Sequence, residues 1–478
     1  MRTFGISMEH YAREWPIIRT MQMPTLDSAT AELLKQTTAR CPVCAAQCPG
    51  EVWRTGGGDE PARVVMRRTC RVHGMTESLL SSDARFYWLS KGSEENSCGT
   101  GCACSADPHG FTGTLGRNAL TPDNGECERL ATCLALIEIV DSCNLACPTC
   151  YADSPRGAVN YSTLENLQQR IQGVIDRKGG IEILQLSGGE PTLHPRFFEL
   201  LAWLQSHPRI DYVLLNTNGV RLAADEAFAT QLAADFQRGK FQLYLQFDGV
   251  QAAAQHTLRG VDLRPVRQKA LARCEAAGIP VTLAMTVTEE NLEHLWEAAQ
   301  FGLGYACMRG ISYQPMFLSG RIPTASTGRR LNTADIITAL VEQAAGKLQW
   351  EDFTPLPCGD PNCATIGYLL KTPAGPRSVS NFIDFTSMQG FLRDKVRYTL
   401  DDLAHCGCEN EPLADMLKAF ELDASHTFRL FIKPFMDAHT WDEDRIDRCC
   451  THVIRPDGKL DSFCRYYSGF VDTNCATR

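Results

Sequence analysis

Between residues 133 and 315, short apolar runs alternate with stretches that carry apolar residues at helical spacing. The runs are bounded by polar and turn-forming residues, a pattern that is typical of buried β-strands. They are LALIEIVD (134–141), EILQLS (182–187), YVLLNTN (212–218), FQLYLQFD (241–248), PVTLAMTV (280–287) and GISYQPM (310–316). The predicted helices cover residues 162–177, 195–205, 223–236, 265–277 and 291–301. This alternation predicts an α/β fold with a parallel sheet, closed or partly closed as a barrel.

Polar segments follow four of the predicted strands, at residues 141–150, 187–192, 216–219 and 246–249. In a barrel of parallel strands, active sites lie at the C-terminal ends of the strands. We therefore expect these four segments to converge on one site. The alternative is that they serve only as turns, which strand ends need in any fold. Their coincidence with a group of three cysteines favours the functional interpretation.

The overall composition describes an ordinary globular chain, with 44% hydrophobic and 22% charged residues among 478. The net charge of −9 and the absence of a long Lys/Arg run make nucleic acid an unexpected partner. No apolar stretch approaches the roughly 20 residues needed to cross a bilayer. The first residues, MRTFGISMEHYAREWP, carry acidic groups where a signal peptide would be apolar. These features predict a cytoplasmic protein.

Cysteine is the unusual component, with 22 residues in the chain. A reducing compartment does not support a disulfide framework, so metal binding is the better interpretation. The cysteines gather at short spacings, as expected when a turn presents several thiolates to one centre. The groups are 41/44/48, 98/102/104, 143/147/150, 358/363, 406/408 and 449/450. Cys274 and Cys307 stand apart in helical and strand-like patterns and are interpreted as small buried hydrophobic residues.

The segment DSCNLACPTCY places Cys143, Cys147 and Cys150 directly after the first predicted strand. A cubane iron–sulfur cluster normally takes four thiolates, so three closely spaced ones leave one iron free to bind a small molecule. A fourth cysteine from elsewhere in the chain is the alternative, because so many thiols are present.

DSCNLACPTCY followed by LQLSGGEPTLHP resembles the radical S-adenosylmethionine (radical SAM) superfamily over roughly residues 133–315. The resemblance implies a partial (β/α)6 TIM-like barrel. It also implies a 4Fe–4S cluster that chelates S-adenosylmethionine and cleaves it to a 5′-deoxyadenosyl radical, which abstracts hydrogen from substrate. Gly188, Gly189 and Glu190 match the family's GGE motif, in which the carboxylate receives the methionyl ammonium group. Further cofactor-binding positions implied by the resemblance are Asn216, Thr217, Asn218, Gln246 and Asp248.

A narrower resemblance, to the archaeal tetraether synthase group once grouped with radical methylases, extends beyond the barrel. It is carried by the segments CPVCAAQC (41–48), CRVHG (70–74), CGTGCAC (98–104), PCGDPNC (357–363) and the cysteine-containing stretch 435–469. One difference is an insertion between Cys104 and Cys133, which leaves open whether Cys133 or Cys127 is a ligand.

Three further metal centres are expected from these segments. Cys41, Cys44 and Cys70 resemble a tetrahedral site for one iron or zinc ion, completed by Cys48 or His73 and favoured as structural. Two auxiliary 4Fe–4S clusters follow, one on Cys98, Cys102, Cys104 and Cys133, the other on Cys358, Cys363, Cys450 and Cys464. Cys449, Cys406 and Cys408 are rivals for the last set.

These observations predict four parts of the chain. Residues 1–92 form an N-terminal module with the mononuclear site, 93–132 an auxiliary cluster segment, 133–320 the barrel, and 321–478 a C-terminal cluster module that covers the barrel mouth.

Three functions are compatible with this architecture. The first hypothesis is carbon–carbon bond formation at an unactivated carbon of a lipid chain, as the resemblance implies. The second is radical methylation of a pterin or another small molecule, and the third is a non-catalytic electron-transfer protein. The GGE run argues against the third hypothesis, because an electron carrier does not need an amino-acid-binding loop. The first two differ in the site that they require: a long apolar tunnel would favour a lipid chain, and a compact polar pocket would favour a small molecule. Expected partners are a small-molecule or lipid substrate and an electron donor such as flavodoxin or ferredoxin, with contact to a membrane surface allowed.

Overall fold

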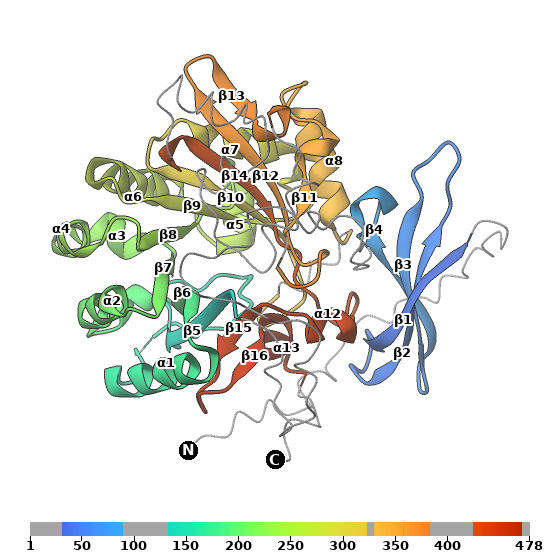
Figure 1. Ribbon diagram of the computed structural model, residues 1–478, viewed down its shortest axis with the longest axis horizontal. Helices are drawn as coiled ribbons and strands as arrows, with labels where there is room; N and C mark the ends of the chain where they lie inside the picture. The colour runs from blue at the N-terminus through green and yellow to red at the C-terminus, as the bar shows by residue number, and fades with distance from the viewer. Residues whose placement is uncertain are drawn as a thin grey trace, which may run out of the picture.

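The computed structural model describes residues 31–88, 132–157, 159–322, 329–356, 358–382 and 424–470. Two sheets organise these residues, a small antiparallel sheet near the N-terminus and a large sheet that contains the barrel. Figure 1 shows the small sheet standing beside the barrel, next to the C-terminal elements.

The small sheet consists of four antiparallel strands in chain order, which the sequence analysis did not predict. They are β1 (Glu32–Arg40), β2 (Gln47–Thr55), β3 (Arg63–Cys70) and β4 (Gly74–Ser81). Its core is made by Ala39, Val52, Val64 and Met66, each fully buried. The cysteines lie where strands meet turns, so the sheet presents them from two neighbouring loops.

The large sheet confirms the predicted α/β fold, because all six expected strands form and pair in parallel with their neighbours in chain order. They are β5 (Leu134–Val140), β6 (Ile181–Gly188), β7 (Ile210–Thr217), β8 (Phe241–Gln246), β9 (Val281–Val287) and β10 (Met308–Pro315). Their pairing brings the C-terminal ends of all six strands to the same edge of the sheet, as a (β/α) barrel requires.

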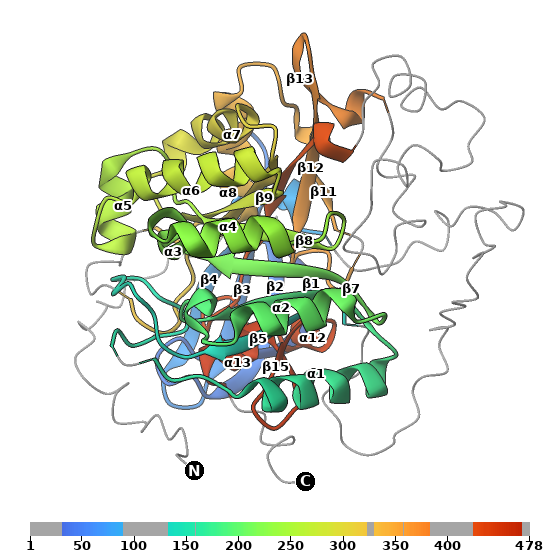
Figure 2. The same ribbon diagram turned by 90° about the vertical axis from the view of Figure 1, so that its left-hand side faces the viewer.

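Helices cover one face of this sheet (Figures 1 and 2). They are α1 (Leu164–Lys178), α2 (Phe197–Ser206), α3 (Val220–Ala224), α4 (Glu226–Asp235), α5 (Ala252–Arg259), α6 (Arg264–Ala277), α7 (Leu295–Leu303) and α8 (Thr333–Gln343). The single helix predicted over 223–236 is divided at Asp225, whose side chain accepts from the Phe228 amide and so caps α4. Helix α5 has only eight residues, and the sequence analysis did not predict it.

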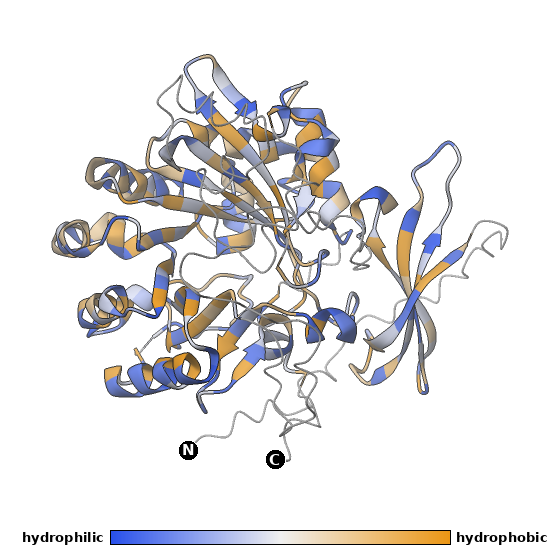
Figure 3. Cartoon of the chain, viewed as in Figure 1, coloured by the Kyte–Doolittle hydropathy of each residue, from blue (hydrophilic) through white to orange (hydrophobic). Residues whose placement is uncertain are grey.

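The two faces of the barrel sheet differ in polarity. Side chains that point toward the helices are apolar and buried, for example Leu184, Leu215, Leu243 and Leu283, and Figure 3 shows the same hydrophobic character along these strands. Near the C-terminal strand ends, the opposite face carries a ring of partly exposed residues that we call the polar belt. Its members are Glu138, Asn216, Tyr244, Gln246, Thr286 and Gln314.

The C-terminal segment continues the barrel sheet at both edges instead of only covering the barrel mouth. Strand β14 (Thr427–Ile432) pairs in parallel with β10, and β12 (Thr365–Thr372) pairs with β14. At the other edge, β15 (Thr451–Ile454) pairs in parallel with β5. The remaining elements are β11 (Thr354–Pro355), β13 (Gly375–Ser378), α12 (Glu443–Asp447), β16 (Leu460–Ser462) and α13 (Phe463–Ser468). An open sheet leaves unpaired backbone groups at its edges, and these strands satisfy them.

The small sheet is fastened to the C-terminal segment through a buried arginine. Arg68, 1% exposed, donates to the backbone carbonyls of Arg40 at 3.2 Å, Ala438 at 2.7 Å and His439 at 2.6 Å. Lys35 of β1 adds ion pairs, among them one to Asp444 at 3.0 Å. The N-terminal module and the segment that precedes Cys449 therefore form one packed unit.

Among the described residues, no helix combines the length and the apolar character needed to span a membrane.

Candidate active site and metal centres

The loop with Cys143, Cys147 and Cys150 leaves the C-terminal end of β5 and is held by backbone contacts. The Cys143 amide donates to the Pro155 carbonyl at 2.9 Å. Cys150 and Arg321 exchange two backbone hydrogen bonds of 2.9 Å each. The Arg321 guanidinium donates to the carbonyls of Cys147 at 3.1 Å and Ser154 at 2.6 Å. The loop is therefore preorganised, and Arg321 is a positioning residue that the sequence motif did not reveal.

The three thiols share one partly buried environment. Burial, together with the charges of Glu190, Cys147 and Cys150, raises the pKa of the Cys143 thiol to about 11, and a hydrogen bond from the Leu145 amide opposes the shift. Burial also raises the pKa of Cys147, whereas the nearby Arg259 guanidinium opposes the shift. Thiols with raised pKa values are poor free nucleophiles and become thiolates when a metal binds. Three soft ligands on one short loop fit an iron–sulfur cluster with one open coordination position.

Gly188 and Gly189 allow the end of β6 to contact the cysteine loop directly. A Cβ atom on Gly188 would lie 1.9 Å from the Val140 carbonyl oxygen, and one on Gly189 would lie 2.1 Å from that of Ser142. Gly188 also has a φ of +125°, which disfavours any other residue. The two glycines therefore permit close approach of the chain to itself. Their contact with the cofactor stays a prediction.

Glu190 is 1% exposed, and both of its carboxylate oxygens are occupied by donors within the chain. It accepts from the Thr192 amide at 3.2 Å and hydroxyl at 2.7 Å, the Thr217 hydroxyl at 2.7 Å and the Asn218 amide at 2.8 Å. Burial raises its pKa, and these hydrogen bonds oppose the shift. Glu190 therefore links the turns after β6 and β7 through hydrogen bonds. Its contact with the methionyl ammonium group stays a prediction.

Asn216 and Asn218 lie at the end of β7, beside the cysteine loop. The Asn216 side chain donates to the Ser187 hydroxyl at 3.3 Å. The side-chain amide nitrogen of Asn218 donates to the Asn144 side-chain oxygen at 2.7 Å and lies 3.7 Å from the Cys143 sulfur. The predicted cofactor-binding residues of β7 are therefore brought next to the predicted cluster ligands, as strand-end convergence requires.

Asp248, another predicted cofactor-binding residue, is fully buried and engaged by Arg259. The guanidinium donates to its two oxygens at 2.6 and 2.8 Å, and the Thr286 amide donates to it at 3.0 Å. With its side-chain oxygen turned toward Arg259, Gln246 accepts from the same guanidinium at 2.6–2.9 Å. Arg259 also donates to the Thr149 carbonyl at 3.2 Å, so it links β8 to the cysteine loop. It was missed because α5, which ends at this residue, was not predicted.

Glu138 lies on β5 at the register position of Ser187, within the polar belt. The hydroxyls of Tyr466 and Tyr467, both on α13, each donate to one of its oxygens at 2.8 Å. The Tyr467 ring packs on Tyr151, with centroids 4.7 Å apart. Burial, and after it the Glu138 carboxylate, raises the pKa of Tyr467, so this phenol stays a hydrogen-bond donor at neutral pH. The sequence analysis did not single out these residues.

Cys133, Cys358 and Cys450 form a compact group, with their sulfur atoms all within 4.8 Å of one another. The sulfurs of Cys133 and Cys358 are joined, and the Cys133 amide donates to the Cys450 carbonyl at 3.2 Å. The prediction had separated Cys133 from the other two. Pairing of β15 with β5 brings Cys450 to Cys133, a contact between residues far apart in sequence.

Cys464, which is buried, and Cys363 and Cys449, which are partly buried, lie close to this group. The charge of Cys363 contributes to the raised pKa of Cys449, and the charges of Cys449 and Cys363 contribute to that of Cys464; burial is the first cause in both thiols. The Arg445 guanidinium lies 3.6 Å from the Cys363 sulfur. The expected set of Cys358, Cys363, Cys450 and Cys464 is thus gathered in one region, together with the rival Cys449.

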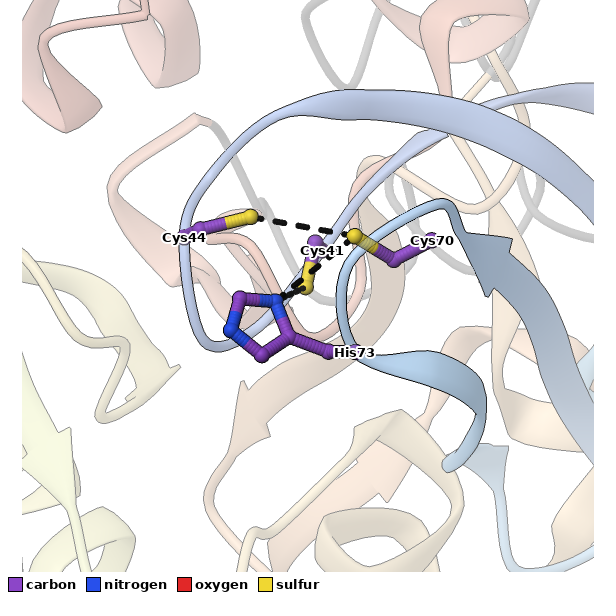
Figure 4. A group of neighbouring side chains, drawn as sticks. All are labelled: Cys41, Cys44, Cys70 and His73. Atoms are coloured by element: carbon purple, nitrogen blue, oxygen red, sulfur yellow. Dashed lines mark hydrogen bonds between the residues drawn. The ribbon is translucent and has the colours of Figure 1, made fainter.

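The N-terminal cysteines form a four-donor group with His73 (Figure 4). The His73 Nδ1 atom lies 3.5 Å from the Cys41 sulfur and 3.6 Å from that of Cys70, and the Cys44 and Cys70 sulfurs are 3.8 Å apart. Backbone hydrogen bonds from His73 and Val72 lower the pKa of Cys70 to about 6. Three thiols and one imidazole fit a closed tetrahedral zinc or iron site. Of the two expected fourth ligands, the geometry favours His73, because the Cys48 sulfur is directed to the Ala39 carbonyl at 3.8 Å.

The other predicted ligands lie outside the described residues. They are Cys98, Cys102 and Cys104, together with the alternatives Cys127, Cys406 and Cys408.

Comparison with protein families agrees with both ends of this description. Residues 137–302 match the Radical SAM superfamily, and residues 33–82 match the HMPTM N-terminal zinc ribbon domain. The first match contains the cysteine loop and the strand ends of β6 to β9. The second contains Cys41, Cys44, Cys70 and His73.

Individual relatives point the same way. The 7,8-dihydro-6-hydroxymethylpterin dimethyltransferase of Methanocaldococcus jannaschii is 25% identical, over 90% of this chain and 93% of that protein. Mycofactocin maturase MftC of Mycobacterium tuberculosis is 30% identical over 35% of this chain and 41% of its own. Among solved structures, Streptococcus suis SuiB bound to its precursor peptide SuiA aligns over 45% of each chain, with 16% identity and a TM-score of 0.37. The chain is an enzyme with a radical SAM domain at residues 137–302.

Proposed function

We propose that this enzyme activates a carbon–hydrogen bond of a small polar heterocycle, with methyl transfer as the outcome. The observation that carries the proposal is the polar belt, which faces the barrel interior beside the cysteine loop. A pocket that recognises a small polar ligand needs a few well-placed hydrogen-bonding groups, whereas a lipid chain needs a continuous apolar lining.

The cofactor assignment follows from the donors described above. Cys143, Cys147 and Cys150 would hold a 4Fe–4S cluster, and Asn216, Asn218 and Gln246 lie where they could contact S-adenosylmethionine. When bound, the cluster supplies the electron that cleaves S-adenosylmethionine and starts radical chemistry. The chain's own contribution is to fix the loop through Arg321 and Arg259 and to orient the substrate.

The polar belt offers both donors and acceptors to such a substrate. Gln314 donates to the Tyr244 hydroxyl at 2.6 Å, and Asn216 contacts Ser187 at 3.3 Å. These side chains are partly exposed, so they keep hydrogen-bonding capacity toward a ligand. A hydrocarbon chain at this position would leave them without partners, at a cost of about 1–3 kcal/mol for each buried group.

The relative that matches over nearly the full length supports the same substrate class, since its name describes dimethyl transfer to a pterin. Once the bond between Cys133 and Cys358 is reduced to two thiolates, Cys133, Cys358 and Cys450, with Cys363, Cys449 and Cys464 nearby, would hold auxiliary iron–sulfur clusters. Cys41, Cys44, Cys70 and His73 would hold a structural zinc or iron ion. The electron donor would be a flavodoxin or ferredoxin, and the enzyme would act in the cytoplasm.

Carbon–carbon bond formation on a lipid chain is the second candidate, because one observation favours it. Phe317, Phe435 and Phe463 pack together beside Tyr151, and the Phe435 and Phe463 centroids are 4.2 Å apart. Phe435 also lines a pocket with Leu79, Phe86 and Leu331 between the small sheet and the barrel. The apolar residues of this pocket would contact part of a hydrocarbon, beside polar lining residues such as Asn332 and Arg445.

The deciding experiment offers both substrates to the same reconstituted enzyme. Protein loaded anaerobically with iron and sulfide is mixed with S-adenosylmethionine, reduced flavodoxin and either 7,8-dihydro-6-hydroxymethylpterin or a diether lipid in detergent. Mass spectrometry follows substrate-dependent 5′-deoxyadenosine and the mass of the product. The triple Cys143/Cys147/Cys150→Ala variant is the control for chemistry at other metal centres.

A mass gain of one or two methyl groups on the pterin supports the proposal. Joined lipid chains without pterin methylation would replace it with the second candidate. Formation of 5′-deoxyadenosine with neither product would reject both substrates and keep only radical cleavage of S-adenosylmethionine.

A further inference from the structure

Glu138 is the single acidic member of the polar belt, and two hydrogen bonds hold its carboxylate in place. Tyr466 and Tyr467 donate to different oxygens at the same distance of 2.8 Å, which fixes the plane of the carboxylate. Both tyrosines come from α13, near the C-terminal end of the described chain, whereas Glu138 belongs to the first barrel strand.

The charge of this carboxylate has no basic partner in the part of the chain that the structure describes. No Lys, Arg or His nitrogen of those residues lies within 4.0 Å of it. Arg170 is close enough for its charge to interact with Glu138, but its guanidinium is committed to the backbone carbonyls of Ile454 at 2.5 Å and Arg455 at 2.9 Å. Glu138 is partly exposed, so the charge is tolerated without a cation.

The carboxylate has unused hydrogen-bonding capacity. Two carboxylate oxygens offer about four acceptor positions, and the two phenols occupy one on each oxygen. Each oxygen therefore keeps at least one acceptor position, and a carboxylate that accepts through both of its oxygens binds two parallel N–H groups. Amidine and guanidine groups present such a pair of donors.

The surroundings place this acceptor next to the reacting centre. Ser187 is the register partner of Glu138 and accepts from Asn216. Tyr151, the residue after Cys150, packs on Tyr467 with centroids 4.7 Å apart. A ligand held by Glu138 would therefore lie in the polar belt, beside the cysteine loop.

We propose that Glu138, oriented by Tyr466 and Tyr467, recognises the substrate by accepting two hydrogen bonds from an amidine-type N–H edge. The 2-amino-4-oxopyrimidine ring of a pterin carries this edge. The inference rests on the proposed function and adds the residue that determines specificity.

The test compares two probes that differ only at this edge, 7,8-dihydro-6-hydroxymethylpterin and its counterpart with a 2-oxo group in place of the 2-amino group. The wild-type enzyme should prefer the pterin, and Glu138→Gln should raise the apparent KM for the pterin about ten- to hundred-fold, as expected for hydrogen bonds to a charged group. The same variant should change the KM for the 2-oxo probe little, so the preference disappears. Asp211→Asn, an exposed carboxylate on β7, is the matched control and should keep the preference.

A purely structural role for Glu138 would lower activity on both probes equally, and that result would overturn the inference. Iron content, S-adenosylmethionine affinity and unfolding temperature are measured for each variant. If Glu138→Gln does not fold, the Tyr466→Phe/Tyr467→Phe double variant tests the same point, because it keeps the charge and removes its orientation. A preference unchanged in that variant would also reject the inference.

The outcomes separate this inference from the proposed function. Methylation of the pterin with an intact preference in Glu138→Gln rejects only the role of Glu138. A wild-type enzyme that acts on neither probe rejects the pterin class and the inference together.

Discussion

The cysteine loop of the barrel and the group of Cys133, Cys358 and Cys450 each bring three thiols together, but they do so in opposite ways. The loop takes all three thiols from eight consecutive residues, 143–150, and Arg321 and Pro155 brace its backbone. The second group takes its thiols from three segments, and Cys133 and Cys358 alone are separated by 225 positions. It exists only because the chain ends up as one sheet.

The difference has an energetic side. The cysteine loop can keep its shape when its metal is absent, since Pro155, Arg259 and Arg321 hold its backbone by hydrogen bonds. A group assembled from distant segments restrains a long stretch of chain, and each added link removes conformational freedom from the unfolded state. We therefore expect the loop to matter most for chemistry and the assembled group to matter most for stability.

The largest expected effect is on chemistry at the loop. Replacing Cys143, Cys147 and Cys150 with Ala should reduce 5′-deoxyadenosine formation to the background without enzyme, because these thiols are the predicted ligands of the catalytic cluster. Liquid chromatography of anaerobic reactions measures the product. The remaining metal and the unfolding temperature should change little, and reductive cleavage that persists in this variant would contradict the assignment.

A single change in the assembled group should show the opposite profile. Cys450→Ala should remove about four irons per chain if these thiols hold a cubane cluster, and should lower the unfolding temperature by several degrees. Iron analysis and calorimetry measure the two effects. Cys274→Ala is the control, since Cys274 is a buried cysteine on α6 that belongs to none of the cysteine groups.

The control variant should cost about 1 kcal/mol of stability and leave the iron unchanged. Equal iron in the wild type and Cys450→Ala would mean that the Cys133–Cys358–Cys450 group is not a cluster site.

Sequence alone predicted the local features well. The six strands were found because each is an apolar run bounded by polar residues, and the cysteine loop was found because its ligands are close in sequence. The cofactor-binding residues on β7 and β8 were implied by the family resemblance, and their contact with S-adenosylmethionine stays a prediction. Their detailed contacts, such as the pairing of Asp248 with Arg259, depend on α5, a helix of eight residues that the sequence analysis did not predict.

The features that sequence missed depend on contacts between distant segments. The membership of Cys133 follows from pairing of β15 with β5, and the role of Glu138 follows from the position of α13. The strands of the small sheet were missed because its residues are rich in Gly, Cys and Arg and show little alternation. The set of Cys98, Cys102 and Cys104 stays a prediction.

The N-terminal site sharpens the comparison, because it too is local. His73→Ala should release the metal bound by Cys41, Cys44 and Cys70, whereas Cys48→Ala should retain it, since the Cys48 sulfur is directed to a backbone carbonyl. Metal analysis after dialysis measures one equivalent of zinc or iron against none. Loss of metal in Cys48→Ala with retention in His73→Ala would exchange the two roles.

The smallest expected effect is at Glu190. Glu190→Gln replaces an oxygen acceptor with an NH₂ group that faces donors, so we expect a loss of about 1–3 kcal/mol in the free energy of unfolding. The affinity for S-adenosylmethionine should fall as well, because the turns after β6 and β7 lose hydrogen bonds that connect them. Denaturant unfolding and calorimetric titration measure the two quantities. Weaker binding with unchanged stability would instead assign Glu190 to direct contact with the ammonium group.

The parallel pairing of β15 with β5 has a consequence for how the protein is made on the ribosome. The first strand of the barrel is synthesised more than three hundred residues before its outer partner, so its edge stays open during most of translation. Cys133 is likewise synthesised long before Cys450. Insertion of the proposed cluster at this group would therefore follow synthesis of the C-terminal segment, and a chain truncated before residue 451 would expose an unpaired strand edge that favours aggregation.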